Sequence, residues 1–294
     1  MMKNIVIGLG EILWDMLPSG KVLGGAPANF AYHASQFGFD GYAVSAIGND
    51  LLGKEILDSL AEKKLNSLLE VVDFPTGTVA VTLDKKGVPQ YEICEGVAWD
   101  NIPFSSQTEV LARNCAAVCF GSLAQRNVVS RNTVLEFLKL VPEDAMKIFD
   151  INLRQHFYTK EIIEHSLKQC NILKINDEEI VIVAELFGWK GLSEETVCKK
   201  LLNDYALQML VETKGATGSY IFTDNDVSYI VTPKVCVADT VGAGDSFTGA
   251  LTAALLNGET IQRAHSLAVE VSAYVCTQHG AMPQLPARFV ELYK

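Results

Sequence analysis

Short apolar runs alternate with amphipathic helical patterns along almost the whole chain, and this alternation constrains the fold more than any other feature. Apolar runs with the length of buried strands lie at 4–9, 42–47, 116–120, 147–151, 172–175 and 208–212. Amphipathic stretches lie between them, at 51–64, 128–140 and 178–187. This order predicts an α/β fold with three layers, in which helices cover both faces of a mostly parallel sheet. In such folds, ligands bind at the carboxyl ends of the strands.

Two segments interrupt this alternation. Residues 12–24 are rich in Gly, Pro and polar residues, and residues 76–99 contain two strand-like runs joined by the turn sequence Asp-Lys-Lys-Gly. The second segment therefore reads as a β-hairpin. We expect both segments to be insertions in a single α/β domain spanning 1–294, where they form a small β-sheet lid that projects from the main sheet.

The charge and the apolar content of the chain exclude several classes of partner. A formal net charge of −11 disfavours nucleic acid and anionic membrane surfaces. The N-terminal apolar run is too short for a signal peptide, and no stretch reaches the ~20 apolar residues of a membrane span. Seven scattered cysteines are typical of reduced thiols, so we expect a cytoplasmic protein.

The most informative segment is 239–250, which reads Asp-Thr-Val-Gly-Ala-Gly-Asp-Ser-Phe-Thr-Gly-Ala. It follows a strand-like run and opens an amphipathic helix. Gly242 and Gly244 leave backbone amides open at the helix N-terminus, which favours phosphate. Asp245 is either a helix-capping acid or a base beside the bound anion. A carboxylate with a pKa of ~3.9 is ionised at neutral pH and can accept a hydroxyl proton.

Segment 239–250 resembles the C-terminal signature of the ribokinase-like sugar kinases, also called the phosphofructokinase B family. The resemblance implies that Asp245 is the catalytic base. It also implies that the amides of Gly242, Ala243, Gly244 and Asp245 form an anion hole for the phosphoryl group of ATP. Mg²⁺ is then the expected metal, and Asp239 is a candidate ligand for K⁺.

A second match lies near the N-terminus, where Gly-Gly-Ala-Pro-Ala-Asn-Phe-Ala begins at Gly24 and Ile-Gly-Asn-Asp-Leu-Leu-Gly follows at 47–53. It resembles the first signature of the same family. By this resemblance Gly24, Gly25 and Asn29 face the sugar, and Asp15 takes the place of the acid that binds sugar hydroxyls. From the residues alone, Pro27 marks a helix start and Asp15 is equally a solvated loop acid.

Three shorter matches follow in chain order. Asp-Ile-Asn-Leu-Arg at 150–154 resembles the Asp-Pro-Asn-x-Arg segment of fructokinases and ketodeoxygluconate kinases, with Ile151 in place of proline; Arg154 would then reach the γ-phosphate or the sugar. Asn-Asp-Glu-Glu at 176–179 resembles a motif that binds nucleotide through Asn176 and Mg²⁺ indirectly through Glu179. The loop 213–218 resembles the nucleotide loop, with contacts from Thr213, Lys214, Gly215 and Gly218. From the residues alone, Arg154 could equally form a surface ion pair. Segment 176–179 could be a helix-capping acid cluster, and the loop 213–218 could be an ordinary turn.

The matches span residues 8–280 in the family's order, and no P-loop sequence occurs. They imply an ATP-dependent kinase acting on a neutral sugar, because only Lys85 and Lys86 supply cations in the hairpin and both fall in its turn. Segment 10–20 looks most like fructokinases, so we expect fructose 6-phosphate as product. A 2-keto-3-deoxygluconate kinase, a ribokinase and a non-catalytic sugar or nucleotide sensor are the alternatives.

Two further expectations concern the small sheet. Trp14 and Trp99 either cover the apolar face of the sugar or belong to the core. The open edges of the small sheet, together with the resemblance, imply a homodimer formed lid against lid.

Overall fold

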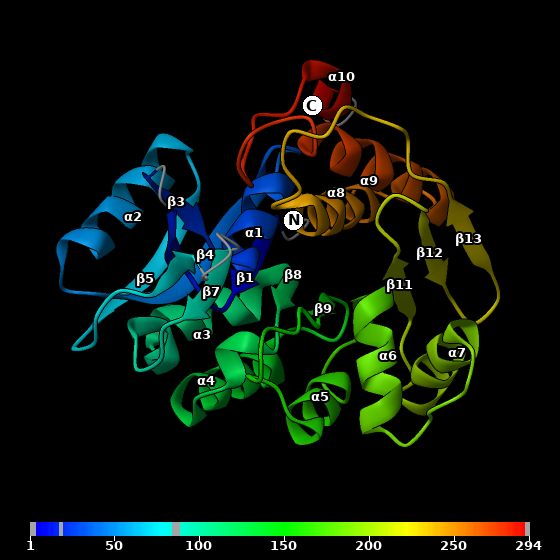
Figure 1. Ribbon diagram of the computed structural model, residues 1–294, viewed down its shortest axis with the longest axis horizontal. Coiled ribbons are helices and arrows are strands. Elements are labelled where there is room, and N and C mark those ends of the chain that lie inside the picture. Colours follow the sequence, from blue (N-terminus) through cyan, green and yellow to red (C-terminus); the bar gives the residue numbers. More distant parts are fainter. Residues whose placement is uncertain (1–3, 18–19, 84–88, 292–294) are drawn as a thin grey trace.

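A computed structural model describes residues 4–17, 20–83 and 89–291. Within these residues the main sheet has nine strands in the order β13-β12-β11-β10-β9-β8-β1-β4-β5 (Figure 1). The strands are β1 (Ile5–Leu9), β4 (Asp40–Gly48), β5 (Asn66–Val72), β8 (Cys115–Phe120), β9 (Met146–Asp150), β10 (Ile172–Asn176), β11 (Met209–Thr213), β12 (Ser219–Phe222) and β13 (Val227–Ile230). Strands β5 to β11 in this order pair in parallel, and β12 and β13 extend the sheet antiparallel. The mostly parallel sheet is as predicted.

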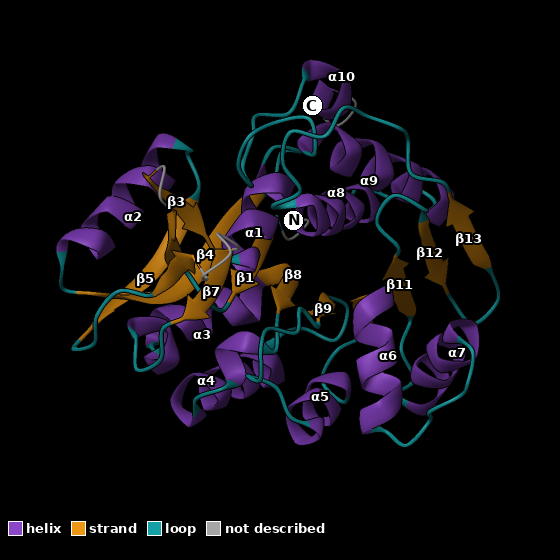
Figure 2. Ribbon diagram, in the orientation of Figure 1, coloured by secondary structure: helices purple, strands orange, loops and turns teal. Residues whose placement is uncertain are grey.

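Helices cover both faces of this sheet, which confirms the three-layer prediction (Figure 2). One face carries α1 (Ala26–Ser35), α2 (Leu51–Glu62), α8 (Ala243–Leu256) and α9 (Ile261–Val275). The other carries α3 (Ser106–Asn114), α4 (Val128–Leu140), α5 (Lys160–Leu167), α6 (Asp177–Leu186) and α7 (Glu194–Asp204). Short helices lie at η1 (Ala98–Asn101), η2 (Leu123–Gln125) and α10 (Ala287–Val290). None of the helices described is long and apolar enough to cross a membrane.

The layers hold together because the central strands are apolar on both faces. Every residue of β8 is buried, and Phe120 at its end stacks on Phe149 of β9 with 5.3 Å between ring centroids. Two separate clusters of buried side chains result, one under each helical layer. This pattern is typical of a parallel sheet covered on both sides, and it fixes the carboxyl ends of the strands as the edge open to ligands.

The two segments that interrupt the alternation form a second sheet of four strands, in the order β3-β2-β6-β7. It consists of β2 (Leu13–Leu17), β3 (Gly20–Gly24), β6 (Thr78–Leu83) and β7 (Pro89–Ile93). β2 and β6 join the two segments as a parallel pair, with Trp14 opposite Thr78. The predicted small sheet is therefore present, and we call it the small sheet below. Lys85 and Lys86 lie outside the described residues.

The two tryptophans of these segments belong to the core rather than to a ligand surface. Trp99 is fully buried, and Trp14 is buried with its Nε1 donating to the carbonyl of Leu52 at 3.0 Å. Neither side chain lines the large cavity described below. Of the two alternatives for these tryptophans, the structure supports the core. Successive side chains of β2 lie on opposite faces of the strand, so the Trp14 ring points away from the face that carries Leu13 and Asp15.

Candidate active site

A cavity of about 600 Å³ is lined by residues of the small sheet and by residues at and after the carboxyl ends of the main-sheet strands. It brings together most of the site residues predicted from both halves of the chain: Asp15, Gly24, Gly25, Asn29, Arg154, Asn176, Thr213, Gly215, Gly242, Gly244 and Asp245. Five separate stretches of sequence thus meet at one place, as expected for loops that follow parallel strands.

Asp245 lies in the first turn of α8, beside an open helix N-terminus. The N-cap residue Gly242 has φ 77°, and a Cβ there would approach Ala281 to 2.7 Å, so only glycine fits. Asn29 of α1 donates from Nδ2 to Asp245 Oδ2 at 2.7 Å. Burial and the nearby Asp150 raise the pKa of Asp245 to about 6, against the lowering effect of Asn29, Lys174 and Arg154. The carboxylate remains ionised at neutral pH, with more basicity than an exposed aspartate.

A buried lysine that the sequence analysis did not identify lies against the helix N-terminus. Lys174 of β10 donates from Nζ to Asp150 Oδ1 at 3.1 Å, and both side chains are buried. Burial lowers the pKa of Lys174, but Asp150, Glu179 and Asp245 together raise it above the ordinary value. A Cβ on Gly244 would lie 2.9 Å from Lys174 Nζ. Glycine at 244 thus lets a permanent cation approach the amides that open α8.

The small sheet contributes the other wall of the cavity. Asp15 of β2 is half-buried, and burial raises its pKa while Arg154 lowers it. A Cβ on Gly24 would come within 2.7 Å of Asp15 Oδ2, so glycine at this position leaves room for the carboxylate. Leu13, Val79 and Ile93 line the same wall. This wall is therefore apolar except for the Asp15 carboxylate, which can accept hydrogen bonds from hydroxyl groups.

Glu11 is a second site residue that the sequence analysis missed. It follows β1, is only 3% exposed, and lines the cavity. Its Oε2 and the Oδ1 of Asn29 are buried without a hydrogen-bond partner among the described residues. Burial raises the pKa of Glu11 to about 7, although its own backbone amide and Arg154 lower it. Two unsatisfied acceptors beside Asp245 indicate a site that is completed by donors from a ligand.

Arg154 lies in the loop after β9. Its side chain is exposed and donates from Nη1 to the adjacent carbonyl of Leu153 at 3.1 Å. Asn152 and Gln155 flank it with φ of 42° and 48°, in the left-handed region that costs about 1 kcal/mol or more for such residues. The guanidinium thus lines the cavity without an acidic partner among the described residues, available to an anionic ligand.

The segment 176–179 caps α6. Asn176 Oδ1 accepts hydrogen bonds from the amides of Glu178 and Glu179, and the Glu179 carboxylate accepts from the amides of Asn176 and Leu153 at 3.0 and 2.9 Å. Both Glu179 oxygens are therefore occupied, while Asp177 and Glu178 line the cavity. Within the described residues no cluster of three acids, histidines or cysteines could hold a metal. These residues fit Mg²⁺ only if phosphate and water supply most of its ligands.

Asp239 ties two loops together beside the helix N-terminus. Its Oδ1 accepts from the amide of Val241 at 3.0 Å, and its Oδ2 accepts from the amide of Gly280 at 3.1 Å. The side chain does not line the cavity, and its predicted contact with K⁺ stays a prediction.

A second cavity, of about 550 Å³, adjoins the first and shares Thr213, Gly215, Thr240 and Gly244 with it. Its other lining residues are mostly apolar or small and include Gly218, Val235, Val237, Ala243, Phe247 and Ala273. An apolar cleft joined to an anion-binding helix N-terminus suits a purine nucleotide.

Lys214 does not line either cavity. Its ammonium binds Glu194 and lies 3.8 Å from Glu212, and these contacts turn it away from the nucleotide side. Two acids of α7 and β11 thus hold its charge, and the contact between Lys214 and the nucleotide stays a prediction.

Comparison with known proteins shows which family has this fold and these motifs. The sequence profile described as pfkB family carbohydrate kinase matches residues 19–288. The chain is a carbohydrate kinase of the pfkB family. The recognition made from its motifs is thus confirmed.

Relatives of this pfkB-family kinase match it over nearly its whole length. It is 28% identical to an ATP-dependent 6-phosphofructokinase of Thermoanaerobacterium thermosaccharolyticum, covering 97% of this chain and 91% of that one. It is 26% identical to the probable fructokinase-4 of Arabidopsis thaliana, covering 97% and 94%. Among solved structures, the fructokinase of Xylella fastidiosa with bound ATP superposes with a TM-score of 0.83 at 21% identity, covering 99% and 98%. The ribokinase-like fold is therefore shown.

Proposed function

We propose that this pfkB-family kinase transfers the γ-phosphoryl group of ATP to the primary hydroxyl of D-fructose and forms fructose 6-phosphate. The observation that supports this most directly is the position of Asp245. It lines the polar cavity under the small sheet, follows Gly244, which lines both cavities, and accepts a hydrogen bond from Asn29.

The residues divide the reaction between them. The sugar hydroxyl lies against Asp245, which accepts its proton as the oxygen attacks phosphorus, and ADP leaves. The amides that open α8 and the ammonium of Lys174 stabilise charge on the transferring phosphoryl group. Arg154 supplies a planar cation with several donors for the same group or for the sugar. Mg²⁺, bound near 176–179 through phosphate and water, would neutralise phosphate charge.

The lining of the cavity favours a sugar without a phosphate group. On the side of the small sheet it presents Leu13, Val79, Ile93 and the acid Asp15. Among the described residues its cations are Arg154 and Lys174, and Lys174 already pairs with Asp150. A second phosphate in the site would have Arg154 as its one unpaired cation among the described residues and would also meet the carboxylates of Asp15 and Glu11. The names of the plant relatives agree with fructose, whereas the 6-phosphofructokinase relative makes fructose 6-phosphate the competitor to test.

A coupled ATP-consumption assay over a panel of sugars tests the proposal. Fructose, ribose, 2-keto-3-deoxygluconate and fructose 6-phosphate are compared by kcat/KM at one ATP concentration. We expect fructose to give the highest value. A higher kcat/KM for any of the other sugars would contradict fructose as the substrate but would still support kinase activity. Binding of a sugar without ATP turnover would instead favour a sensor.

We also propose that the small sheet closes over the sugar and forms a twofold contact with a second copy. Among the described residues its outer strands β3 and β7 pair on one side only, and open edges are normally covered or paired. Sedimentation at high concentration should then show a dimer, and hydrogen exchange within 76–99 should slow on adding fructose. Sedimentation as a monomer would contradict the proposed dimer contact. Unchanged hydrogen exchange in 76–99 would contradict the closure of the small sheet over the sugar. We expect the cytosol as compartment, since the reaction uses ATP and the seven cysteines are free thiols.

A further inference from the structure

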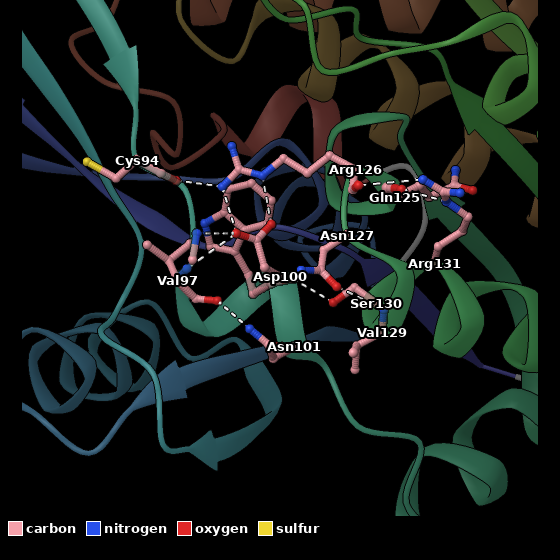
Figure 3. Close-up of polar contacts among 12 residues, drawn as sticks. Cys94, Val97, Asp100, Asn101, Gln125, Arg126, Asn127, Val129, Ser130 and Arg131 are labelled. Atoms are coloured by element: carbon pink, nitrogen blue, oxygen red, sulfur yellow. Dashed lines mark hydrogen bonds and ion pairs between the residues drawn. The ribbon is translucent and has the colours of Figure 1, made fainter.

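A buried arginine lies at the base of the small sheet and outside the active site. The guanidinium of Arg126 is held between the rings of Trp99 and Phe157, 4.0 and 4.4 Å from their centroids. Its Nε and Nη2 donate to Asp100 at 2.7 and 2.9 Å, and Nη2 also donates to the carbonyl of Cys94 (Figure 3). The side chain is 6% exposed, and its third nitrogen, Nη1, has no partner among the described residues.

A cavity of about 250 Å³ lies beside this guanidinium. Three stretches of chain line it: the exit from the small sheet at 95–100, the turn and helix start at 126–131, and the loop 156–162. None of its lining residues lines the large cavity that contains Asp245. The two pockets are therefore separate, and the pocket beside Arg126 contains none of the proposed catalytic residues.

Positive potential converges on this pocket from several elements. Arg131 lines it and donates from Nε to the carbonyl of Gln125 at 2.8 Å, with no acidic partner among the described residues (Figure 3). The N-cap residues of two helices, Asn127 of α4 and Thr159 of α5, line it as well. Each helix start carries a partial positive charge and unpaired amides.

The two acids of the pocket do not cancel this potential. Asp100 accepts hydrogen bonds from Arg126 and from the amides of Gly96 and Val97 at 3.0 and 3.3 Å, so its charge is compensated. Glu95 lies on the exposed rim. An anion in the pocket would therefore meet Arg131 and two helix N-termini beside the Arg126–Asp100 ion pair, whose buried Nη1 still lacks an acceptor among the described residues, and would face one solvated carboxylate.

We propose that this pocket binds the phosphate group of a small phosphate monoester, at a site distinct from the catalytic cavity. Planar guanidinium groups and helix N-termini both suit phosphate oxygens. The volume leaves room for a small organic moiety beside the phosphate. The sugar phosphate that a carbohydrate kinase forms belongs to this class, so the protein itself produces a suitable ligand.

The bound anion would act on two parts of the catalytic machinery. The exit of the small sheet and the loop that carries Phe157 both line the pocket, and the amide of Phe157 bonds the carbonyl of Arg154 at 3.0 Å. A phosphate bridging these segments restricts the movement of the small sheet relative to Arg154. Occupancy should therefore lower turnover without competing for ATP.

Calorimetric titration of the whole protein with fructose 6-phosphate, and separately with inorganic phosphate, tests the site. Arg131→Gln should weaken fructose 6-phosphate binding about tenfold, because one charge-assisted contact of ~1.5 kcal/mol is lost. Arg131→Lys should restore part of the lost affinity for fructose 6-phosphate. Glu95→Gln should increase that affinity above wild type by removing the repelling charge. Lys139→Gln, which removes an exposed charge from the same helix α4, is the matched control and should change nothing.

The variants separate this proposal from the assignment of the substrate, because Arg131 and Glu95 lie outside the catalytic cavity, where fructose 6-phosphate would also bind as a product. Binding that responds to Arg131 and Glu95 with opposite signs, and not to Asp245→Asn, supports the pocket. Binding unchanged in Arg131→Gln, or absent at millimolar ligand, overturns it. Inorganic phosphate binding as tightly as fructose 6-phosphate would overturn the monoester as the ligand.

Discussion

Asn29 Nδ2 lies 2.7 Å from Asp245 Oδ2 and joins two helices whose residues are 216 positions apart in the sequence. The contact orients the carboxylate and lowers its pKa, while burial and Asp150 raise it to about 6 overall. One amide thus orients the proposed base and moderates the pKa increase that burial and Asp150 cause.

The pH profile of the kinase should report this contact. Because Asp245 must be ionised to accept a proton, kcat/KM should rise with pH through a midpoint near 6. Asn29→Ala removes a hydrogen bond to the ionised form, so the midpoint should move to higher pH along with a fall in rate. Initial rates between pH 5 and 9 measure both. A midpoint that stays in place or moves down would contradict the proposed coupling.

Glu11 should make the protein less stable as the pH rises. Its pKa is about 7 in the folded chain against 4.5 for an ordinary glutamate, so folding takes up protons between these values. The resulting loss of stability across this window is of the order of 3 kcal/mol. Glu11→Gln removes that pH dependence, so its stability relative to wild type should improve from pH 5 to pH 8.

Urea unfolding at the two pH values measures this difference. Glu136→Gln, which changes an exposed glutamate of α4, should show no such trend. An advantage for Glu11→Gln that is equal at both pH values would show that Glu11 is already ionised in the folded chain.

Potassium should stimulate turnover through Asp239. Its two oxygens already hold the loops at 241 and 280 beside the anion-binding amides, so a cation there would reinforce both. Rates are compared in potassium, sodium and a large organic cation, with Asp239→Asn beside the wild type. Potassium should raise the wild-type rate more than that of the variant. Equal rates in all three salts would contradict a potassium site at Asp239.

Asp15 should determine which sugar is used. It is an acceptor on the wall formed by the small sheet, and a sugar that lacks the matching hydroxyls leaves its carboxylate unpaired. Asp15→Ala should lower kcat/KM for fructose roughly 10- to 100-fold, since such contacts contribute ~1–3 kcal/mol. The dissociation constant for ATP should not change. Asp73→Ala, at an exposed acid, is the control, and an equal loss for every sugar tested would contradict a role in selectivity.

The sequence predicted the central strands and the ligand edge because both follow from strong local patterns. β8 is a continuous apolar run and β10 is an apolar run interrupted by Lys174, and both lie between helical stretches. The glycines at 242 and 244 indicate an open helix start. The edge strand β5 was not predicted, and neither were β12 and β13 at the other end of the main sheet. β12 and β13 are only four residues long and β13 is largely exposed, so their periodicity is weak.

The missed site residues depend on contacts between distant segments. Lys174 is one polar residue within an apolar strand, and its function becomes visible only when β9 places Asp150 beside it. Glu11 reads as an ordinary loop acid until the cavity shows it buried without a partner. A charged residue within or just after a buried strand is the signal that would have identified both.

Asp245→Asn tests the central claim most directly. The substitution keeps the size of the side chain and removes the proton acceptor, so the fold and the dissociation constant for ATP should be retained. Turnover with the best sugar of the panel should fall by about 10²- to 10⁴-fold, as is typical when a general base is lost. Turnover within a few-fold of wild type, in a variant that folds and binds ATP normally, would show that Asp245 is not the base.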